Sequence, residues 1–353
     1  MTVRGPISLD ELGITLAHEH IMIDLTCWYQ EPIQASQKSY ANEHVTLDNL
    51  WRLKQNLSCN KENMMLQDAG KAAEEVMEFK RFGGGSIVDV TNIGIGRDPI
   101  SLRNISIETG VNVIMGAGYY VSNSHPPDMD DRSEEEIAVE IISDVTKGVG
   151  KTGIKAGIIG EIGLSDIESL PNEEKVLRAA VTAQKETGAA LTLHPATHTI
   201  SSDGCHNINF KSSSERIIEV LEEEGADMKG VIMGHSELYM DDTMEHQFMT
   251  ADTGMFIEYD TWGFEGNWPR IGLVEPSDTQ RLNGIIKLLE NGYQDQLLLS
   301  QDVCNKIQLM AYGGFGYAHI LRDCMPLFRK ASITEEEIQK MLVDNPKRIL
   351  RFK

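Results

Sequence analysis

The chain has 353 residues, of which 32 are Lys or Arg and 54 are Asp or Glu, and its formal net charge is -22. An acidic surface repels phosphate backbones and anionic lipid headgroups, which excludes nucleic acid and membranes as expected partners. The sequence has no apolar run near the roughly 18 residues of a transmembrane span and no basic or apolar leader at its start, so it predicts a cytoplasmic protein with a small-molecule substrate, and we consider a homodimer.

The first predicted element, residues 14–24 (ITLAHEHIMID), is an apolar strand that contains two histidines. Successive side chains of a strand point to opposite faces, so His18 and His20 project from the same face. Two imidazoles placed in this way can bind one metal ion. The alternative is that both make ordinary hydrogen bonds in the core, and further ligands elsewhere in the chain would decide between the two.

Seven more apolar segments follow in chain order, separated by amphipathic stretches typical of helices, such as 134–149, 172–188, 213–227 and 279–293. Alternation of strand and helix indicates parallel pairing. We therefore predict one domain over residues 1–353, a (β/α)8 TIM barrel with a long first connection (25–63) and a C-terminal helical tail; the alternative is a doubly wound open sheet. The seven segments are 85–91, 112–120, 155–163, 190–196, 230–236, 255–260 and 296–302.

In four of these segments we single out a further histidine or carboxylate near the end. In a TIM barrel the C-terminal strand ends form the functional face, so such residues should meet there. Taken singly, each histidine could be hydrogen-bonded in the core and the aspartate could cap a helix. The glutamate in GIIGEIG, however, would be costly to bury as an anion without a metal or a base. Four imidazoles and two carboxylates suit two divalent ions, with Zn²⁺ the expected metal. The six candidate ligands are His18, His20, Glu161, His194, His235 and Asp302.

The cysteines do not add to this site. They are odd in number, widely spaced and include no Cys-x-x-Cys pair, which favours reduced thiols over a disulfide framework or a zinc knuckle. A metal centre in this chain must therefore rest on nitrogen and oxygen ligands. The five are Cys27, Cys59, Cys205, Cys304 and Cys324.

The motifs carry a resemblance to a known family. A His-x-His pair on the first strand, a carboxylate on the fourth, histidines on the fifth and sixth and an aspartate on the eighth are similar to the phosphotriesterase family of the amidohydrolase superfamily. The segments TLAHEH, KAGIIGEIG, MGHSE and YGGFGYAHIL, with the ending NPKRILRFK, resemble its branch called phosphotriesterase-related protein over essentially the whole chain. The resemblance implies carbonyl chemistry, including removal of an acetyl group from a small N-acetyl amino sulfonate, or opening of lactones.

The resemblance also implies how the ligands divide. His18, His20, Glu161 and Asp302 would hold one metal, and Glu161 would share the other with two histidines, His194 and His235. Enzymes that give the family its name bridge their metals with a carboxylated lysine, whereas the related branch resembles this chain in using glutamate. Lys155 has the same strand parity as Glu161 but lies roughly 20 Å upstream along an extended strand, so we assign the bridge to Glu161.

Two such metals can bridge a water molecule, lower its pKa and polarise the bond under attack. We predict that Asp302 takes the proton from the resulting hydroxide and passes it to the leaving group. The expected substrate is a small carboxylic-acid derivative, an N-acyl amide, ester or lactone, and an anionic one. The pocket should include Tyr120 and Trp262 from the loops and Lys306 as the group that binds the anion. For these three, the alternatives are ordinary packing and an exposed surface lysine.

The other histidines have weaker claims. His198 could reach the substrate, and we leave it unassigned; His44, His125, His206, His246 and His319 are expected to be structural or exposed. Three other functions stay open: hydrolysis of phosphotriesters or other phosphoesters, a metal-dependent nuclease of the same superfamily, and a barrel that holds metal only structurally. The net charge argues against the nuclease. An open six-ligand cluster argues against a structural metal, because structural zinc normally has a closed shell.

Overall fold

The computed structural model describes residues 1–196, 199–201, 204–206, 210–264, 266–269 and 273–352. Eight strands form one parallel sheet in the order β1-β4-β5-β6-β7-β10-β11-β14. The sheet closes so that its first and last strands meet. The contact is a hydrogen bond from the Asp302 amide, after β14, to the His18 carbonyl of β1 at 3.3 Å. The predicted (β/α)8 barrel is confirmed. The strands are β1 (Ile14–Glu19), β4 (Gly84–Asp89), β5 (Asn112–Ala117), β6 (Ile158–Leu164), β7 (Leu191–Pro195), β10 (Val231–Met233), β11 (Phe256–Tyr259) and β14 (Leu297–Leu299).

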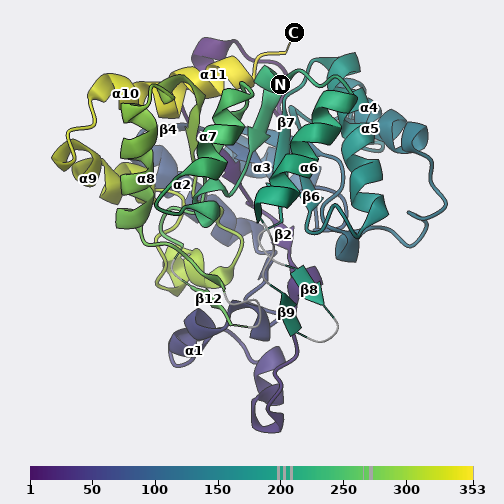
Figure 1. The fold of residues 1–353 in the computed structure, drawn as a ribbon. Helices are drawn as coiled ribbons and strands as arrows, with labels where there is room; N and C mark the ends of the chain where they lie inside the picture. Colours follow the sequence, from purple (N-terminus) through teal and green to yellow (C-terminus); the bar gives the residue numbers. More distant parts are fainter. Residues whose placement is uncertain (197–198, 202–203, 207–209, 265, 270–272, 353) are drawn as a thin grey trace.

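Helices surround the barrel (Figure 1). Their ends follow local sequence signals: the Asp98 side chain accepts from the Ile100 and Ser101 amides at the start of α3, and Gly110 ends that helix in the left-handed region at φ 69°. The outer helices are α2 (Ala69–Arg81), α3 (Pro99–Thr109), α4 (Glu134–Thr146), α5 (Pro171–Thr187), α6 (Phe210–Glu223), α7 (Glu245–Asp252) and α8 (Asp278–Glu290). The predicted C-terminal tail comprises α9 (Met325–Lys330), α10 (Glu335–Gln339) and α11 (Asn345–Ile349).

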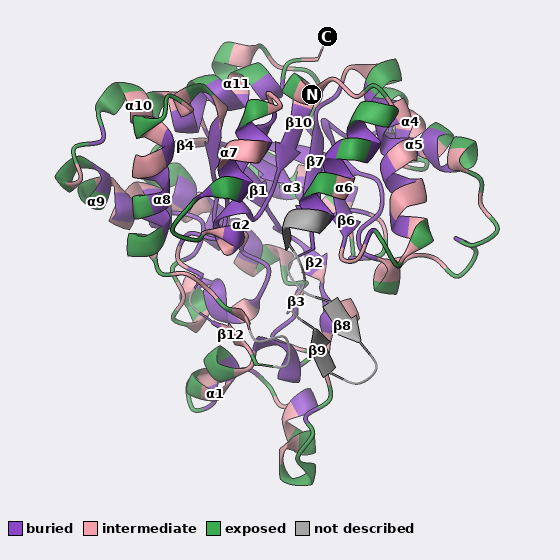
Figure 2. Cartoon of the chain, viewed as in Figure 1, coloured by how far each residue is buried: buried purple, intermediate pink, exposed green. Residues whose placement is uncertain are grey.

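The barrel strands are buried on both faces, whereas the outer helices expose one side (Figure 2). This is why the strands read as nearly continuous apolar runs in the sequence instead of alternating with polar residues. Polar groups inside such a barrel need partners, which makes the buried histidines and carboxylates of the strands conspicuous. No helix in the described part of the chain combines the length and apolarity needed to cross a bilayer.

Short two-stranded sheets lie at the end of the barrel opposite the two termini (Figure 1). They pair β2 (Ile23–Asp24) with β3 (Met65–Leu66), β8 (Thr199–Ser201) with β9 (Gly204–His206), and β12 (Asn267–Trp268) with β13 (Leu273–Val274). Helix α1 (Leu50–Gln55) lies at the same end. The sequence predicted one strand over 14–24, but β1 ends at Glu19 because the Ile21 amide turns to donate to the Asp89 side chain at 2.7 Å.

Candidate metal centre

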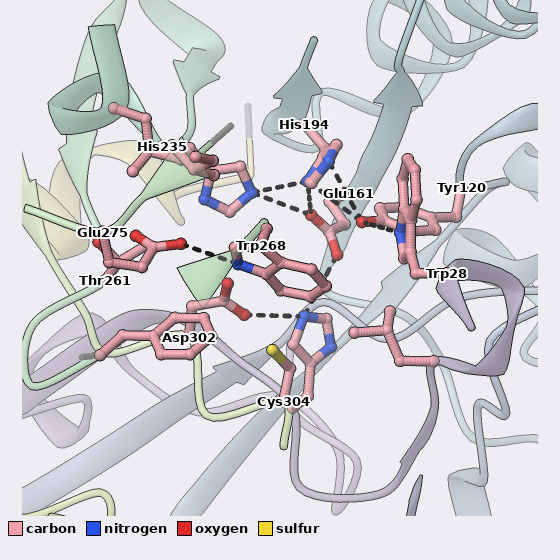
Figure 3. Close-up of a pocket in the computed structure, with 15 residues that line it drawn as sticks. Trp28, Tyr120, Glu161, His194, His235, Thr261, Trp268, Glu275, Asp302 and Cys304 are labelled. Atoms are coloured by element: carbon pink, nitrogen blue, oxygen red, sulfur yellow. Dashed lines mark hydrogen bonds and ion pairs between the residues drawn. The ribbon is translucent and has the colours of Figure 1, made fainter. Parts of the chain in front are cut away.

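The six predicted ligands meet inside the end of the barrel that carries these short sheets, with Glu161 at their centre. Figure 3 labels four of them, Glu161, His194, His235 and Asp302. One carboxylate oxygen, Oε2, lies 3.4 Å from His18 Nε2 and 3.1 Å from His194 Nδ1. The other, Oε1, lies 3.2 Å from His20 Nε2. That same nitrogen is 3.3 Å from Asp302 Oδ1. Glu161 is thus in contact with the histidines at the start of the chain, His18 and His20, and with His194 after them in the sequence.

Some ring nitrogens of the cluster lack the hydrogen bonds that core histidines normally make, whereas His20 Nδ1 contacts the Thr91 hydroxyl at 2.8 Å. Both ring nitrogens of His18 are buried and have no hydrogen-bond partner. His194 Nδ1 and His235 Nε2 lie only 2.6 Å apart, so their lone pairs repel unless a proton or a cation is shared between them. His18, Glu161 and His235 each offer an atom within 4.8 Å of the others, and His18, His20 and Asp302 form a second such group. Nitrogen and oxygen donors in two overlapping groups fit two divalent ions.

The electrostatics of the cluster also favour a cation. Burial disfavours charge on His18, but the carboxylates of Glu161 and Asp260 outweigh it and raise the pKa of His18 well above its ordinary value. The pKa of His20 rises to about 9, because Asp302 and Glu161 likewise outweigh burial. Burial would raise the pKa of Glu161, yet the neighbouring His18 holds it well below its usual range. His194 is the exception, since burial and the neighbouring His235 lower its pKa. A site that stabilises positive charge on the other three imidazoles attracts metal cations for the same reason.

Two of the six residues have an unusual backbone. His235, after β10, has φ 49° and Asp302, after β14, has φ 45°, both in the left-handed region that side chains with a Cβ rarely adopt. The turn at each position directs the side chain back towards the barrel axis. Strain of this kind persists where surrounding contacts enforce it, and it is concentrated at functional sites.

A carboxylate on β11's C-terminal end orients the histidines. Asp260 accepts from the His235 ring at Nδ1 (2.8 Å) and from the His235 amide (2.9 Å). Since a carboxylate only accepts, His235 Nδ1 carries the proton and Nε2 is free to bind a metal. The other Asp260 oxygen lies 3.4 Å from His18 Nδ1. A Cβ on Gly234 would approach that oxygen to 3.2 Å and the Leu193 carbonyl to 2.7 Å, so this position requires glycine.

Glu19, the last residue of β1, lies between His18 and His20 in the sequence but does not contact the same groups. It points away from the cluster and accepts from the Ser300 hydroxyl (2.7 Å) and from the amides of Gln301 (2.8 Å) and Val303 (2.9 Å). These three donors flank Asp302. Glu19 therefore ties β1 to the turn that presents Asp302, and burial raises its pKa to about 8.

A cavity opens above the cluster, walled mainly by aromatic and aliphatic side chains. Tyr120 is one of them, and its hydroxyl lies 3.2 Å from His194 Nε2 and accepts from Trp28 Nε1 at 3.1 Å. Burial raises the pKa of Tyr120 well above its ordinary value, so its hydroxyl stays protonated. The wall outside the six candidate ligands comprises Leu25, Trp28, Tyr120, Leu238, Thr261, Phe264, Trp268, Leu273, Glu275 and Cys304.

Two predicted pocket residues lie elsewhere. Trp262 is 1% exposed and packs edge-on against Phe328 in the core, with ring centroids 5.1 Å apart. Lys306 lines a separate cavity, and its ammonium pairs with Glu62 at 2.5 Å. The placement of both at the substrate cavity was therefore wrong. His198 lies outside the described residues.

Sequence reasoning also missed residues that the site uses. Asp260 and Glu258 share one face of the predicted strand 255–260, so the parity argument applied to His18 and His20 would have pointed both into the barrel. Lys155 precedes β6 at the other end of the barrel, as its spacing from Glu161 predicted. Glu275 follows a short hairpin, and no sequence pattern indicated that it would line the cavity.

Comparison with known proteins places the chain in a family. The phosphotriesterase family matches residues 1–350. N-acetyltaurine hydrolase of Xenopus tropicalis is 37% identical over 356 residues, which cover 100% of this chain and 97% of that protein. A resiniferatoxin-binding protein from Rhodobacter sphaeroides has a TM-score of 0.92 and 37% identity, covering 99% of this chain and 94% of its own. A mutant of a phosphotriesterase-like lactonase from Deinococcus radiodurans has a TM-score of 0.75 and 26% identity, covering 99% of each chain. The chain belongs to the phosphotriesterase family.

Proposed function

We propose that the protein is a metal-dependent hydrolase of small carboxylic-acid derivatives, namely N-acyl amides, esters or lactones. The observation that carries the proposal is the buried cluster of four imidazoles and two carboxylates, in which His18 has no hydrogen-bond partner for either ring nitrogen. Relatives named N-acetyltaurine hydrolase and a lactonase of the same fold support carbonyl chemistry.

In this proposal His18, His20, Glu161 and Asp302 hold one divalent ion, and Glu161 shares the second with His194 and His235. When bound, two divalent ions lower the pKa of water and polarise a carbonyl group. Glu161 is suited to the shared position because its two oxygens face different histidines of the cluster.

Asp302 is the proposed general base. Its side chain is 14% exposed, whereas that of Glu161 is 2% exposed, so it is the more open carboxylate of the cluster. Burial would raise the pKa of Asp302, but His20 and His18 outweigh it and lower that pKa, which keeps the group ionised at neutral pH. Asp302 can therefore accept a proton from the attacking water and return it to the leaving group.

Tyr120 is the proposed donor to the substrate. Its protonated hydroxyl lies in the cavity wall beside His194, where it can donate to the carbonyl oxygen as negative charge develops there. The hydroxyl also accepts from Trp28, which fixes its direction. Tyr120→Phe should lower kcat more than it raises KM, because the lost hydrogen bond strengthens in the transition state.

The test is a parallel screen of metal-loaded protein against N-acyl amides, carboxylic esters, lactones and a neutral phosphotriester. We expect turnover of at least one acyl class, and a fall of at least about 100-fold in kcat for Asp302→Asn. Efficient hydrolysis of the phosphotriester alone would contradict the proposal and favour the phosphoester alternative.

Finer features of the proposal stay predictions. Zinc is the expected metal because imidazole and carboxylate ligands suit it, and elemental analysis of the purified protein checks it. The cytoplasmic location and the homodimer are also predictions, the latter checked by sedimentation at several concentrations. Lys306 no longer supports the prediction of an anionic substrate, because it pairs with Glu62 in a different cavity.

A further inference from the structure

The hairpin formed by β12 and β13 brings one acidic side chain to the substrate cavity. Glu275 follows β13 directly, and its amide donates to the Gly266 carbonyl at 3.3 Å, which holds it beside the hairpin. Its side chain is only 3% exposed and lines the cavity next to Trp268 (Figure 3). Glu275 is not one of the six candidate metal ligands.

The carboxylate of Glu275 has an unused acceptor. Oε1 accepts from Trp268 Nε1 at 3.2 Å, but Oε2 is buried and has no hydrogen-bond partner. Oε2 forms only a long ion pair with Arg281, whose Nη2 lies 3.9 Å away, beyond hydrogen-bonding distance. The Arg281 guanidinium donates instead to Asp278, to the Thr261 hydroxyl and to a backbone carbonyl. Burial raises the pKa of Glu275 to about 7, although Arg281 opposes this rise. A ligand that supplies a hydrogen-bond donor to Oε2 therefore favours the ionised carboxylate and removes the cost of leaving a buried oxygen without a partner.

The surroundings make this acceptor selective. Outside the six candidate ligands, Glu275 is the one charged side chain among the described residues that line the cavity. The other residues of the wall include Trp268, Phe264 and Leu273, whose side chains are apolar apart from the indole nitrogen. In such a setting the interaction between a carboxylate and a ligand charge is stronger than in water, and this applies to repulsion as well as attraction.

We propose that Glu275 determines substrate specificity by accepting a hydrogen bond from an N–H or ammonium group of the substrate, at a position away from the scissile carbonyl. This inference rests on the proposed acyl hydrolysis and names its substrate class: acyl compounds that carry a cationic or hydrogen-bond-donating group. The sulfonate of N-acetyltaurine, the compound named for the relatives, would instead face a carboxylate here.

A matched series of amides tests the inference. N-(2-aminoethyl)acetamide, N-acetylethanolamine and N-acetyltaurine share an acetamide and a two-carbon spacer but end in an ammonium, a hydroxyl and a sulfonate. Monoacetyl diamines with three to five carbons extend the reach of the ammonium. With metal-loaded wild-type protein, we expect the best ammonium compound to exceed N-acetyltaurine in kcat/KM by about 10-fold or more, since charge-assisted hydrogen bonds are among the strong ones.

The preference should depend on Glu275. Glu275→Gln should lower kcat/KM for the ammonium compounds by about 10-fold, mainly through KM, and should leave the sulfonate unchanged or improved. Glu290→Gln, an equal charge change at an exposed position of α8, is the matched control and should behave as the wild type. Glu275→Asp keeps the charge and should retain part of the preference. Circular dichroism and metal content verify that each variant is folded and loaded.

Calorimetric binding of the same compounds to the metal-loaded proteins gives a readout that does not need turnover. An equal or reversed preference in the wild type, or a preference that survives in Glu275→Gln, overturns the inference while acyl hydrolysis stands. Absence of hydrolysis for every acyl compound overturns the proposed function, and ammonium binding that requires Glu275 would then still support the inference. If ammonium binding that requires Glu275 is also absent, the inference is overturned together with the proposed function.

Discussion

At the scale of single residues, the orientation of the ligands depends on Asp260. One of its oxygens accepts from the His235 ring and the other lies near His18, so a single carboxylate fixes two imidazoles of different strands. Gly234 leaves the space for this approach. Partners of this kind set the tautomer and raise the basicity of a metal-binding histidine.

Asp260→Asn should therefore weaken metal binding without removing a ligand. An amide can offer only one acceptor oxygen, so His235 and His18 can no longer both be matched. We expect the affinity for Zn²⁺ to fall about 10-fold to 100-fold, measured by competition with a chromophoric chelator. Asp295→Asn, an exposed carboxylate paired with Lys340, is the control for the loss of charge. Equal affinities in the two variants would contradict this role.

The positions of the six candidate ligands could be read from the sequence because they lie on or directly after buried strands, where parity and barrel geometry fix direction. The residues that form the cavity wall could not be read from the sequence. Trp262 and Lys306 follow strands in the same way, but their loops turn them towards Phe328 and Glu62, contacts that sequence spacing does not encode. Glu275 reaches the cavity through a hairpin whose position depends on distant packing.

At the scale of elements, Glu19 connects the first strand to the last. Three donors from the turn after β14 converge on its carboxylate, and two of them are backbone amides. The barrel thereby closes at the point where Asp302 must be held. The eight-strand fold was predictable from alternating apolar and amphipathic runs, whereas the short sheets at the mouth were not, because two-residue or three-residue strands leave no periodic signal.

Removing this connection should cost stability. Glu19→Ala leaves the Gln301 and Val303 amides without their acceptor, at about 1–3 kcal/mol for each buried donor. We expect the free energy of unfolding in urea to fall by about 2–6 kcal/mol and metal occupancy to fall with it, since Asp302 loses its support. Glu108→Ala, at an exposed position of α3, is the control. A stability within about 0.5 kcal/mol of the wild type would contradict the proposed connection.

His246 in helix α7 provides a second prediction at the scale of elements. Both ring nitrogens of His246 are buried without a hydrogen-bond partner in the described structure, and its ring lies on Tyr239 at 4.3 Å between centroids. Burial lowers the pKa of His246 from 6.5 to about 4. The unfolded chain therefore binds a proton that the folded chain resists between these values, so stability is lost as the pH falls below about 6.5.

His246→Leu should remove that loss. For the wild type the contribution amounts to about 3 kcal/mol between pH 7 and pH 4. We expect the difference in unfolding free energy between variant and wild type to shift by this amount in favour of the variant over that range. Urea unfolding at several pH values measures it, and parallel pH profiles for the two proteins would exclude this protonation effect.

At the scale of the whole molecule, the candidate metal centre joins strands that are far apart in the sequence. Its residues come from β1, β6 and β7 and from the segments directly after β1, β10 and β14, so bound metal would cross-link both halves of the barrel. Ligands that bind only the folded state stabilise it by an amount that grows with the logarithm of their concentration divided by Kd, about 4 kcal/mol when the free concentration is 1,000 times Kd. Metal-free protein should thus melt at a lower temperature, and readdition of Zn²⁺ should restore the melting temperature.

The most direct test of the metal centre is the metal content of the purified chain. Elemental analysis of protein prepared without chelator should give close to two divalent ions per chain for the wild type and for Lys155→Ala, and at most one for Glu161→Ala. A wild-type value near zero after supplementation with zinc would contradict the metal centre. Loss of metal in Lys155→Ala, with bicarbonate enhancing wild-type loading, would contradict Glu161 as the shared ligand.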